Sequence, residues 1–325
     1  MRVSVPEIRE ASRQALENAG ALPWIAASVA DAVAAAEAHG NVICGLYYLE
    51  SYVLQLGSGR VKGDVEPVVS QPKPGAVLSD ARYGFAQPAF ARGLPVALET
   101  AASQGITLFS VAHSHTCTSL GYFTEQIARA GFIGIGLTNA SAIVAPPGGK
   151  GRMLGTNPFA FSVPGPGGLG MHYDSSTSAV ALGKITMAKA AGESIPEGWA
   201  VDAEGRPTTD PEAALQGSLV SAAGYKGWGL GLLVEVMAAA LTGSVSSRDV
   251  AGLKVTDGDP HDLGQTYVIV DAGVFSDHFG DDLSALAAAT AEAGGRLPGA
   301  GREAMEVVDV PDALWELTLK LAAQP

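Results

Sequence analysis

The middle of the chain differs in texture from both ends, and this contrast limits the folds open to it. Between residues 106 and 180, short runs such as ITLFSVA, FIGIGLTNA and FAFSVP alternate with turns of glycine and proline. Short runs bounded by such turns predict β-strands. On either side, apolar residues recur at helical spacing in residues 5–22, 24–39, about 227–242 and two tail segments, DLSALAAATAEAGG and PDALWELTLKLAAQ. A late strand is predicted at residues 266–272.

The length and the order of these segments predict two domains. The chain has 325 residues, of which 47% are apolar and 16% charged, so it can bury a large core. Residues 1–105 together with residues 275–325 are predicted to form a mostly helical domain. Residues 106–274 are predicted to form a β-rich domain between those two helical segments.

Charge and cysteine content narrow the class of partner. The formal net charge of −13 argues against nucleic acid or anionic lipid as the main ligand, because an acidic surface repels phosphates. The first residues lack the apolar core of a signal peptide, and no run of about 18 apolar residues occurs. Cys44 and Cys117 stand in apolar or site-like contexts, which favours reduced thiols. We therefore expect a cytoplasmic protein that contacts neither membranes nor nucleic acids.

Common nucleotide-binding loops are absent from the sequence. GFIGIG at residues 131–136 is rich in glycine, but it is spaced GxxGxG and lies inside an apolar run. A Rossmann fingerprint needs GxGxxG at a strand-to-helix turn, so a closely packed strand is the better interpretation. GxSxG and P-loop motifs are missing as well.

The segment HSHTC at residues 113–117 raises the question of a metal site. In a strand, His113, His115 and Cys117 would point to one face, as ligands of a zinc ion need to do. HExxH and CxxC motifs are absent, and the acidic segment DGDPHDLG at residues 257–264 is typical of a solvated loop. The favoured interpretation is a polar strand end that lines a pocket without metal.

A row of short polar side chains offers a second candidate site. MLGTNPFAFSVPG at residues 153–165 and HYDSSTSAVALGK at residues 172–184 supply Thr156, Asn157, Ser175, Ser176 and their neighbours. With Lys184 or Lys226 nearby, such donors could bind an anion or a pyrophosphate without a glycine loop. Ordinary turn and cap chemistry is the alternative.

Several of these motifs, taken in order, resemble one enzyme family. GKGRMLGTNPFAFSVPG, IPEGWAVDAEGRPTTDPEAAL, GYKGWGLGLLVEVMAAALTG, LGQTYVIVD and RLPGAGRE follow the order seen in the type-2 malate/L-lactate dehydrogenase family. That family includes ureidoglycolate and sulfolactate dehydrogenases and the reductases of Δ1-pyrroline- and Δ1-piperideine-2-carboxylate. The resemblance implies an α+β, non-Rossmann fold, in which a mostly antiparallel sheet domain binds NADPH or NADH and is inserted in a helical domain. It also implies a homodimer with the active site near the subunit interface.

The resemblance also implies which residues meet the cofactor. In the family, the cofactor is met by the two residues that follow TN at residues 138–139, by the DSS turn at residues 174–176, by the lysine of GYKG and by the Pro-Gly turn of RLPGAGRE. With the hydroxyl of LGTNP, the expected cofactor contacts are Ala140, Ser141, Thr156, Asp174, Ser175, Ser176, Lys226, Pro298 and Gly299.

The catalytic positions depart from the family pattern. The family has Ser-His-Gly after the second helix and an arginine three residues beyond that glycine, whereas this chain has Ile43, Cys44, Gly45 and Tyr48. A second catalytic histidine of the dehydrogenases is replaced by Thr116. The pyrroline and piperideine carboxylate reductases instead have a small polar residue followed by cysteine there, so the chain is more similar to that branch.

These departures predict an NAD(P)H-dependent oxidoreductase that reduces a C=N bond of a cyclic imine. A protonated iminium needs only hydride, whereas a ketone also needs a proton donor. One alternative is a 2-oxo acid reductase, or 2-hydroxy acid dehydrogenase, that uses His115 or Cys44 as its acid; another is an inactive homologue that still binds nucleotide. The expected catalytic residues are Cys44, Thr116 and His115, and the expected substrate contacts are Tyr47, Tyr48, Cys117 and Asn157.

Overall fold

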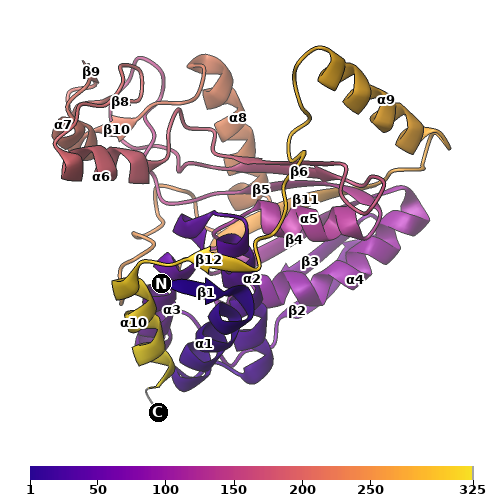
Figure 1. Cartoon of the computed structure of the whole chain (residues 1–325), viewed down its shortest axis with the longest axis horizontal. Helices are drawn as coiled ribbons and strands as arrows, with labels where there is room; N and C mark the ends of the chain where they lie inside the picture. The colour runs from indigo at the N-terminus through magenta and orange to yellow at the C-terminus, as the bar shows by residue number, and fades with distance from the viewer. Residues whose placement is uncertain (324–325) are drawn as a thin grey trace.

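The computed structural model describes residues 1–323 and places a helical layer at one side of the molecule (Figure 1). Helix α1 (Val5–Asn18) packs on α2 (Pro23–Ala38), and α3 (Leu49–Ser58) and α10 (Asp312–Ala322) complete the layer. Ser4 and Glu7 form a capping box at the start of α1, and Pro23 is the first residue of α2. The short strands β1 (Arg2–Ser4) and β12 (Val307–Asp309) pair antiparallel across this layer.

A seven-stranded sheet forms the centre of the molecule. Its order is β2-β3-β4-β11-β5-β6-β7, and every neighbouring pair is antiparallel except β3 and β4. The prediction of a mostly antiparallel sheet is confirmed. The strands are β2 (Val68–Lys73), β3 (Ala76–Asp80), β4 (Ile106–Ser114), β5 (Phe132–Thr138), β6 (Phe159–Val163), β7 (Met171–Ser175) and β11 (Leu263–Asp271).

Two helices pack on one face of this sheet and share its apolar core. Helix α4 (Ala86–Gln104) contacts β3, β4 and β11, while α5 (Gly121–Arg129) contacts β5 and β6. Residues 68–104 therefore pack with the sheet, although the predicted boundary groups them with the helical ends. The parallel β3–β4 pair explains this difference, since a parallel pair needs a crossover and α4 is that crossover.

The glycines of GFIGIG are explained by close packing in β5. A Cβ on Gly134 would lie 2.9 Å from Cβ of Ile127, and one on Gly136 would lie 2.8 Å from Cγ2 of Thr124. Both neighbours belong to α5, which can rest on the strand only because these positions carry no side chain. The interpretation as a packed strand is confirmed.

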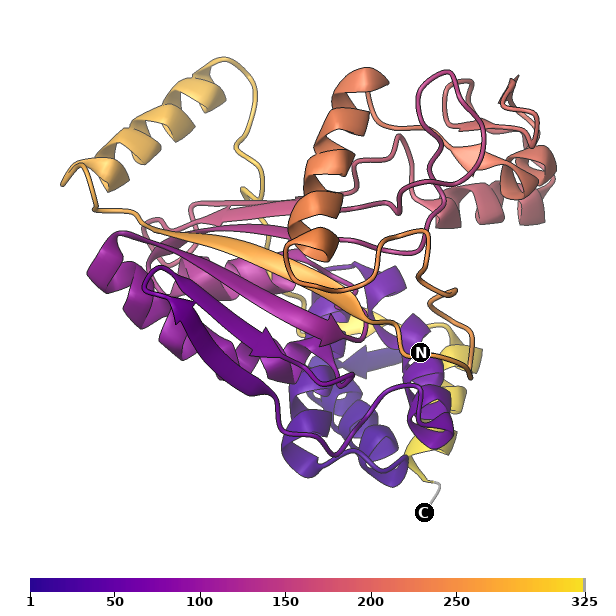
Figure 2. The same ribbon diagram turned by 180° about the vertical axis from the view of Figure 1, so that it is seen from behind.

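Residues beyond β7 form a smaller lobe, which Figure 2 shows beside the sheet. It contains α6 (Leu182–Ala191), α7 (Pro211–Gln216) and a three-stranded sheet of β8 (Ala200–Val201), β9 (Pro207–Thr208) and β10 (Ser218–Leu219). Helix α8 (Tyr225–Glu235) follows and continues into a π-helical turn, Val236–Ala240, that contacts β11 and β5. Helix α9 (Phe279–Glu292) stands away from the body. Within residues 1–323, no helix combines the length and the apolar character needed to cross a membrane.

Candidate active site

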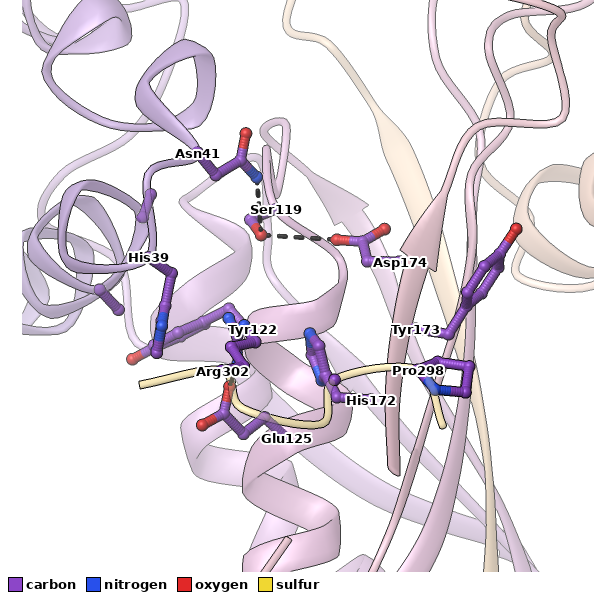
Figure 3. Close-up of a pocket in the computed structure, with 13 residues that line it drawn as sticks. His39, Asn41, Ser119, Tyr122, Glu125, His172, Tyr173, Asp174, Pro298 and Arg302 are labelled. Atoms are coloured by element: carbon purple, nitrogen blue, oxygen red, sulfur yellow. Dashed lines mark hydrogen bonds and ion pairs between the residues drawn. The ribbon is translucent and has the colours of Figure 1, made fainter. Parts of the chain in front are cut away.

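A cavity of about 380 Å³ opens where α2, α5, β7 and the loop after α9 meet (Figure 3). The end of α2 contributes His39, α5 contributes Tyr122 and Glu125, and β7 contributes His172 and Asp174; Asn41, Ser119, Pro298, Gly299 and Arg302 also line it. Three of the residues predicted to meet the cofactor are therefore brought to one cavity from segments 124 residues apart: Asp174, Pro298 and Gly299.

Asp174 is held at the mouth of the cavity by the start of α5. Its Oδ2 accepts the backbone N–H of Gly121 at 2.7 Å and the hydroxyl of Ser119 at 3.5 Å, and Ser119 in turn accepts the amide of Asn41 at 3.3 Å. Gly121 permits this approach, because a Cβ there would lie 2.8 Å from the His172 ring. Oδ1 of Asp174 has no hydrogen-bond partner in the described part of the chain, so it stays free for a ligand.

Cys44 does not itself line this cavity; it ends a short 3₁₀ turn, Val42–Cys44, that follows the lining residue Asn41. Buried Glu37 sets this turn: its Oε1 accepts the N–H of Leu46 at 2.7 Å, and a Cβ on Gly45 would lie 2.2 Å from the same oxygen. Burial, with a smaller contribution from Asp174, raises the pKa of the Cys44 thiol to about 12. The thiol therefore stays protonated at neutral pH and is a weak acid.

Three tyrosines continue from Cys44 along the next turn, Leu46–Tyr48, and into α3. The ring of Tyr48 stacks on that of Tyr52 at 6.0 Å, and the exposed ring of Tyr47 meets Tyr48 edge-on at 5.8 Å. Burial raises the pKa of Tyr48 to about 12. These rings lie beside Cys44, and the role of Tyr47 and Tyr48 as substrate contacts stays a prediction.

The residues of HSHTC do not share one face. Strand β4 ends at Ser114, so the alternation assumed for a metal site stops between the two histidines. Nδ1 of His113 lies 2.7 Å from Oδ1 of Asp262, while Nε2 of His115 bonds Oε1 of Gln55 at 2.6 Å. Residues 1–323 contain no group of three or more His, Cys, Asp or Glu side chains placed to hold a metal ion.

His115 lies in the interior and not at the cavity. It is 2% exposed, its ring stacks on that of His261 at 4.1 Å, and burial lowers its pKa well below the usual value. In this setting it is neutral and enclosed, which weakens its candidacy as an acid. The segment DGDPHDLG is accordingly only partly a solvated loop: Asp257 and Asp259 are exposed, but His261 is buried.

The buried histidine pair should make the protein less stable in acid. Burial lowers the pKa of His261 to about 3, so the unfolded state, with a histidine pKa of about 6.5, binds the extra proton. Stability is therefore lost as the pH falls from about 6.5 towards 3, and His261 alone should account for about 2 kcal/mol between pH 8 and pH 5. Urea unfolding at the two pH values measures the loss.

His261→Leu should remove that part of the pH dependence, and His278→Gln, at an exposed histidine, should leave it unchanged. An identical pH dependence in all three proteins would contradict the assignment to His261.

Asn157 is used within the fold and does not face the cavity. It is 0% exposed, and its amide donates to the carbonyl of Gly231 at 3.1 Å and to Oε2 of Glu235 at 2.8 Å. Its Oδ1 accepts the hydroxyl of Ser247 at 3.3 Å. The structure thus gives this side chain the task of fixing α8, in place of the predicted substrate contact.

The other predicted cofactor residues continue from β7 towards α8. Ser175 and Ser176 follow Asp174, and Thr177 next to them donates its N–H to the Thr156 carbonyl at 2.9 Å. A Cβ on Gly155 would lie 2.3 Å from the Ala140 carbonyl, which places Ala140 and Ser141 beside this segment. Exposed Lys226 lies in the first turn of α8. Just before this helix, the N–H of Ala222 donates to the carbonyl of Thr177 at 2.9 Å. These contacts link Thr156, the serine row and the start of α8 to one another, while Pro298 and Gly299 lie at the cavity on the other side of Asp174.

Sequence reasoning missed the side of the cavity made by His39, His172, Glu125 and Arg302. Arg302 bonds Glu125 at 2.5 Å, and burial together with Arg302 lowers the pKa of His172 to about 4. Arg302 belongs to the RLPGAGRE motif, so its closeness in sequence to Pro298 and Gly299 could have predicted that it lines the same cavity. Glu125 lies on an ordinary amphipathic helix and His39 follows the last residue of α2, and neither position carried a signal in the sequence.

Comparison with known proteins supports a common origin along almost the whole chain. The family model described as malate/L-lactate dehydrogenase matches residues 3–305. A (2R)-3-sulfolactate dehydrogenase (NADP(+)) of Chromohalobacter salexigens is 39% identical over 96% of this chain and 95% of its own. A Δ1-pyrroline-2-carboxylate reductase of Ancylobacter novellus is 36% identical over 92% and 89%. The crystal structure of Δ1-piperideine-2-carboxylate reductase from Pseudomonas syringae superimposes with a TM-score of 0.92 at 30% identity, covering 99% of each chain.

Proposed function

The chain belongs to the malate/L-lactate dehydrogenase family, and on this premise we propose that it reduces the C=N bond of a cyclic imine by hydride transfer from NADPH or NADH. The resemblance noted in the sequence is thereby confirmed. Relatives named as pyrroline- and piperideine-2-carboxylate reductases support the choice of an imine.

The observation that carries this proposal is the weakness of the acids at the three candidate positions 44, 48 and 115. Cys44 and Tyr48 both have a pKa raised to about 12 by burial, and His115 is enclosed in the interior. Efficient general acids have a pKa near the working pH, so none of these groups suits protonation of an alkoxide. An iminium ion carries its proton on nitrogen already and needs only hydride.

The residues present fit a nicotinamide nucleotide. Gly299 approaches β7 so closely that a Cβ would lie 2.8 Å from His172, which leaves a cradle without side-chain bulk, and Oδ1 of Asp174 is free to accept a hydroxyl or amide. Pro298 and Gly299 would hold one part of the nucleotide, with Ser175, Ser176 and Lys226 along the remainder. When bound, the nucleotide supplies the hydride.

The chain's own residues position the imine for that transfer. The rings of Tyr47 and Tyr48 lie beside Cys44 and offer aromatic surface on which a small ring can lie, while the buried ring of Tyr52 stacks on Tyr48 and supports it.

The cofactor part is tested by binding. Millimolar NADPH or NADH should raise the melting temperature, since a ligand that binds only the folded state stabilises it by mass action. Lys226→Ala should raise the dissociation constant about tenfold, as expected for the loss of one charge-assisted hydrogen bond of about 1.5 kcal/mol.

Lys184→Ala is the matched control, because Lys184 is a second lysine near the serine row, on α6. It should leave the affinity unchanged. Absence of a thermal shift with both nucleotides would refute the oxidoreductase proposal.

A second candidate is oxidation or reduction of a 2-hydroxy or 2-oxo acid. The 39% identity to a sulfolactate dehydrogenase favours it. Turnover of sulfolactate but of no imine would select this candidate, and nucleotide binding without any turnover would select an inactive homologue.

Three further features complete the proposal. The sheet domain binds the nucleotide without a Rossmann loop and is inserted between helical segments. Two copies form a homodimer, for which the exposed apolar side chains of Leu233 in α8 and Val236 in the π-helical turn, each about half exposed, are the supporting observation. A cytoplasmic location agrees with two cysteines that form no disulfide.

A further inference from the structure

Lys254 is placed against the tyrosine wall from a distant part of the chain. Its ammonium lies 3.1 Å from the centroid of the Tyr47 ring and 5.1 Å from that of Tyr48. It also donates to the carbonyl oxygen of Tyr47 at 3.0 Å. A cation over an aromatic face is attracted by the ring, while its remaining N–H groups stay available to a ligand.

The backbone that carries Lys254 is fixed from below by two buried side chains. Nε2 of Gln55, which is 0% exposed, donates to the carbonyls of Leu253 at 2.9 Å and Val255 at 2.6 Å, the two neighbours of Lys254. Arg60, 1% exposed, donates to the Val255 carbonyl as well. The backbone before and after Lys254 is therefore fixed by interior side chains, which is unlike the setting of an ordinary surface lysine.

The charge of Lys254 is unpaired. No carboxylate in residues 1–323 lies within salt-bridge distance of its ammonium, although the chain carries a net charge of −13. Its nearest companions are aromatic rings and one backbone carbonyl. An ammonium kept in this way is prepared for an anion that arrives with a ligand.

Lys254 lies where a cation is needed to bind a substrate carboxylate. Tyr48 cannot pair with a carboxylate, and it stands where the resemblance implies a carboxylate-binding arginine. The ammonium of Lys254 lies beside that same ring. Relatives named for pyrroline-2-carboxylate, piperideine-2-carboxylate and sulfolactate all take anionic substrates.

We propose that Lys254 binds the carboxylate of the substrate and so makes this site selective for carboxylated cyclic imines. The inference rests on the proposed function and assigns the substrate class within it. The resemblance implies an arginine at position 48 for this task; in this chain the cation comes from residue 254.

The test compares Δ1-pyrroline-2-carboxylate with 2-methyl-1-pyrroline, a cyclic imine without the carboxylate. Lys254→Ala should lower kcat/KM for the carboxylated imine about 10- to 100-fold, mainly through KM, as expected for one hydrogen bond between charged groups. Turnover of the uncharged imine and KM for NADPH should stay within about twofold. Lys254→Arg should recover most of the loss.

Lys62→Ala is the matched control, since Lys62 also lies over a tyrosine ring, 5.4 Å from the centroid of Tyr83. It should change neither substrate's kinetics. An equal loss on both imines would reduce Lys254 to a structural role, and a rise confined to KM for NADPH would assign it to a cofactor phosphate; either result overturns the proposal.

A binding measurement separates this proposal from the function on which it rests. Cyclopent-1-ene-1-carboxylate has the ring and the carboxylate but no C=N bond, and calorimetry with NADP⁺ present gives its affinity. Weaker binding to Lys254→Ala, in a protein that reduces no imine, would refute the imine reductase and keep the carboxylate site. Unchanged binding would refute the carboxylate site alone.

Discussion

We expect the protein to reduce Δ1-pyrroline-2-carboxylate with a kcat/KM at least about 100-fold above that for pyruvate, oxaloacetate or glyoxylate. A positioned general acid contributes about 10²–10⁴ in rate, and the groups at positions 44 and 48 are poor proton donors for carbonyl reduction. The thiol of Cys44 and the phenol of Tyr48, both with a pKa raised to about 12, hold their protons too tightly. Oxidation of NADPH at pH 7 with each substrate measures the ratio.

The variant Cys44→Ala tests whether the reaction needs no proton donor from the protein or whether Cys44 acts as that donor. Imine reduction should fall by less than about tenfold, because the substrate brings its own proton. Loss of all turnover in Cys44→Ala, or ordinary enzyme rates on simple 2-oxo acids, would show that Cys44 is a proton donor after all.

The reverse change tests the same argument. Ile43→Ser, Cys44→His and Tyr48→Arg together rebuild the family pattern and should raise activity on 2-oxo acids. The new arginine would lie beside Lys254, so the two cations repel each other until a carboxylate binds between them. We therefore expect the triple variant to depend more strongly on an anionic substrate than the natural sequence does.

Gly264→Ala should be the most destabilising small change in the sheet. A Cβ there would lie 1.8 Å from the Ala238 carbonyl oxygen and 2.3 Å from Oγ1 of Thr242, where the π-helical turn meets β11. Thr266 donates to the Met237 carbonyl of the same turn at 2.7 Å, so neither segment can move freely. Overpacking of this kind costs about 3 kcal/mol or more.

Urea unfolding measures this loss, and Gly57→Ala is the control. Gly57 lies inside α3 with open space around it, so alanine should stabilise the protein by about 0.5–1 kcal/mol. A Gly264→Ala protein as stable as the natural one would mean that β11 and the π-helical turn are less closely packed than described.

Local features of the fold were readable from the sequence. Pro23 marks a helix start, and the glycines of β5 mark a strand under a helix, because each of these effects depends on neighbouring residues. The place of residues 68–104 was not readable: β3 joins β4 in parallel through α4, and that pairing depends on contacts across the sheet.

The same limit applies to the candidate site. The motifs supplied Asp174, Pro298 and Gly299, which the structure brings to one cavity. His115 was given a catalytic role because neither its stacking on His261 nor its bond to Gln55 leaves a trace in the local pattern. Lys254 lies 207 residues from Tyr47, so only the folded chain shows that the two meet.

The ribbon of β1 and β12 has a consequence for synthesis. Val3 pairs with Val308, and the N-terminal ammonium bonds Asp312, so the helical layer contains both early and late residues. While the ribosome is still adding the last tenth of the chain, α1 lacks its partner α10 and the apolar faces of the layer stay open. Contacts of such high sequence separation form slowly. During synthesis, α1 and α2 must therefore be kept from aggregating until α10 has emerged.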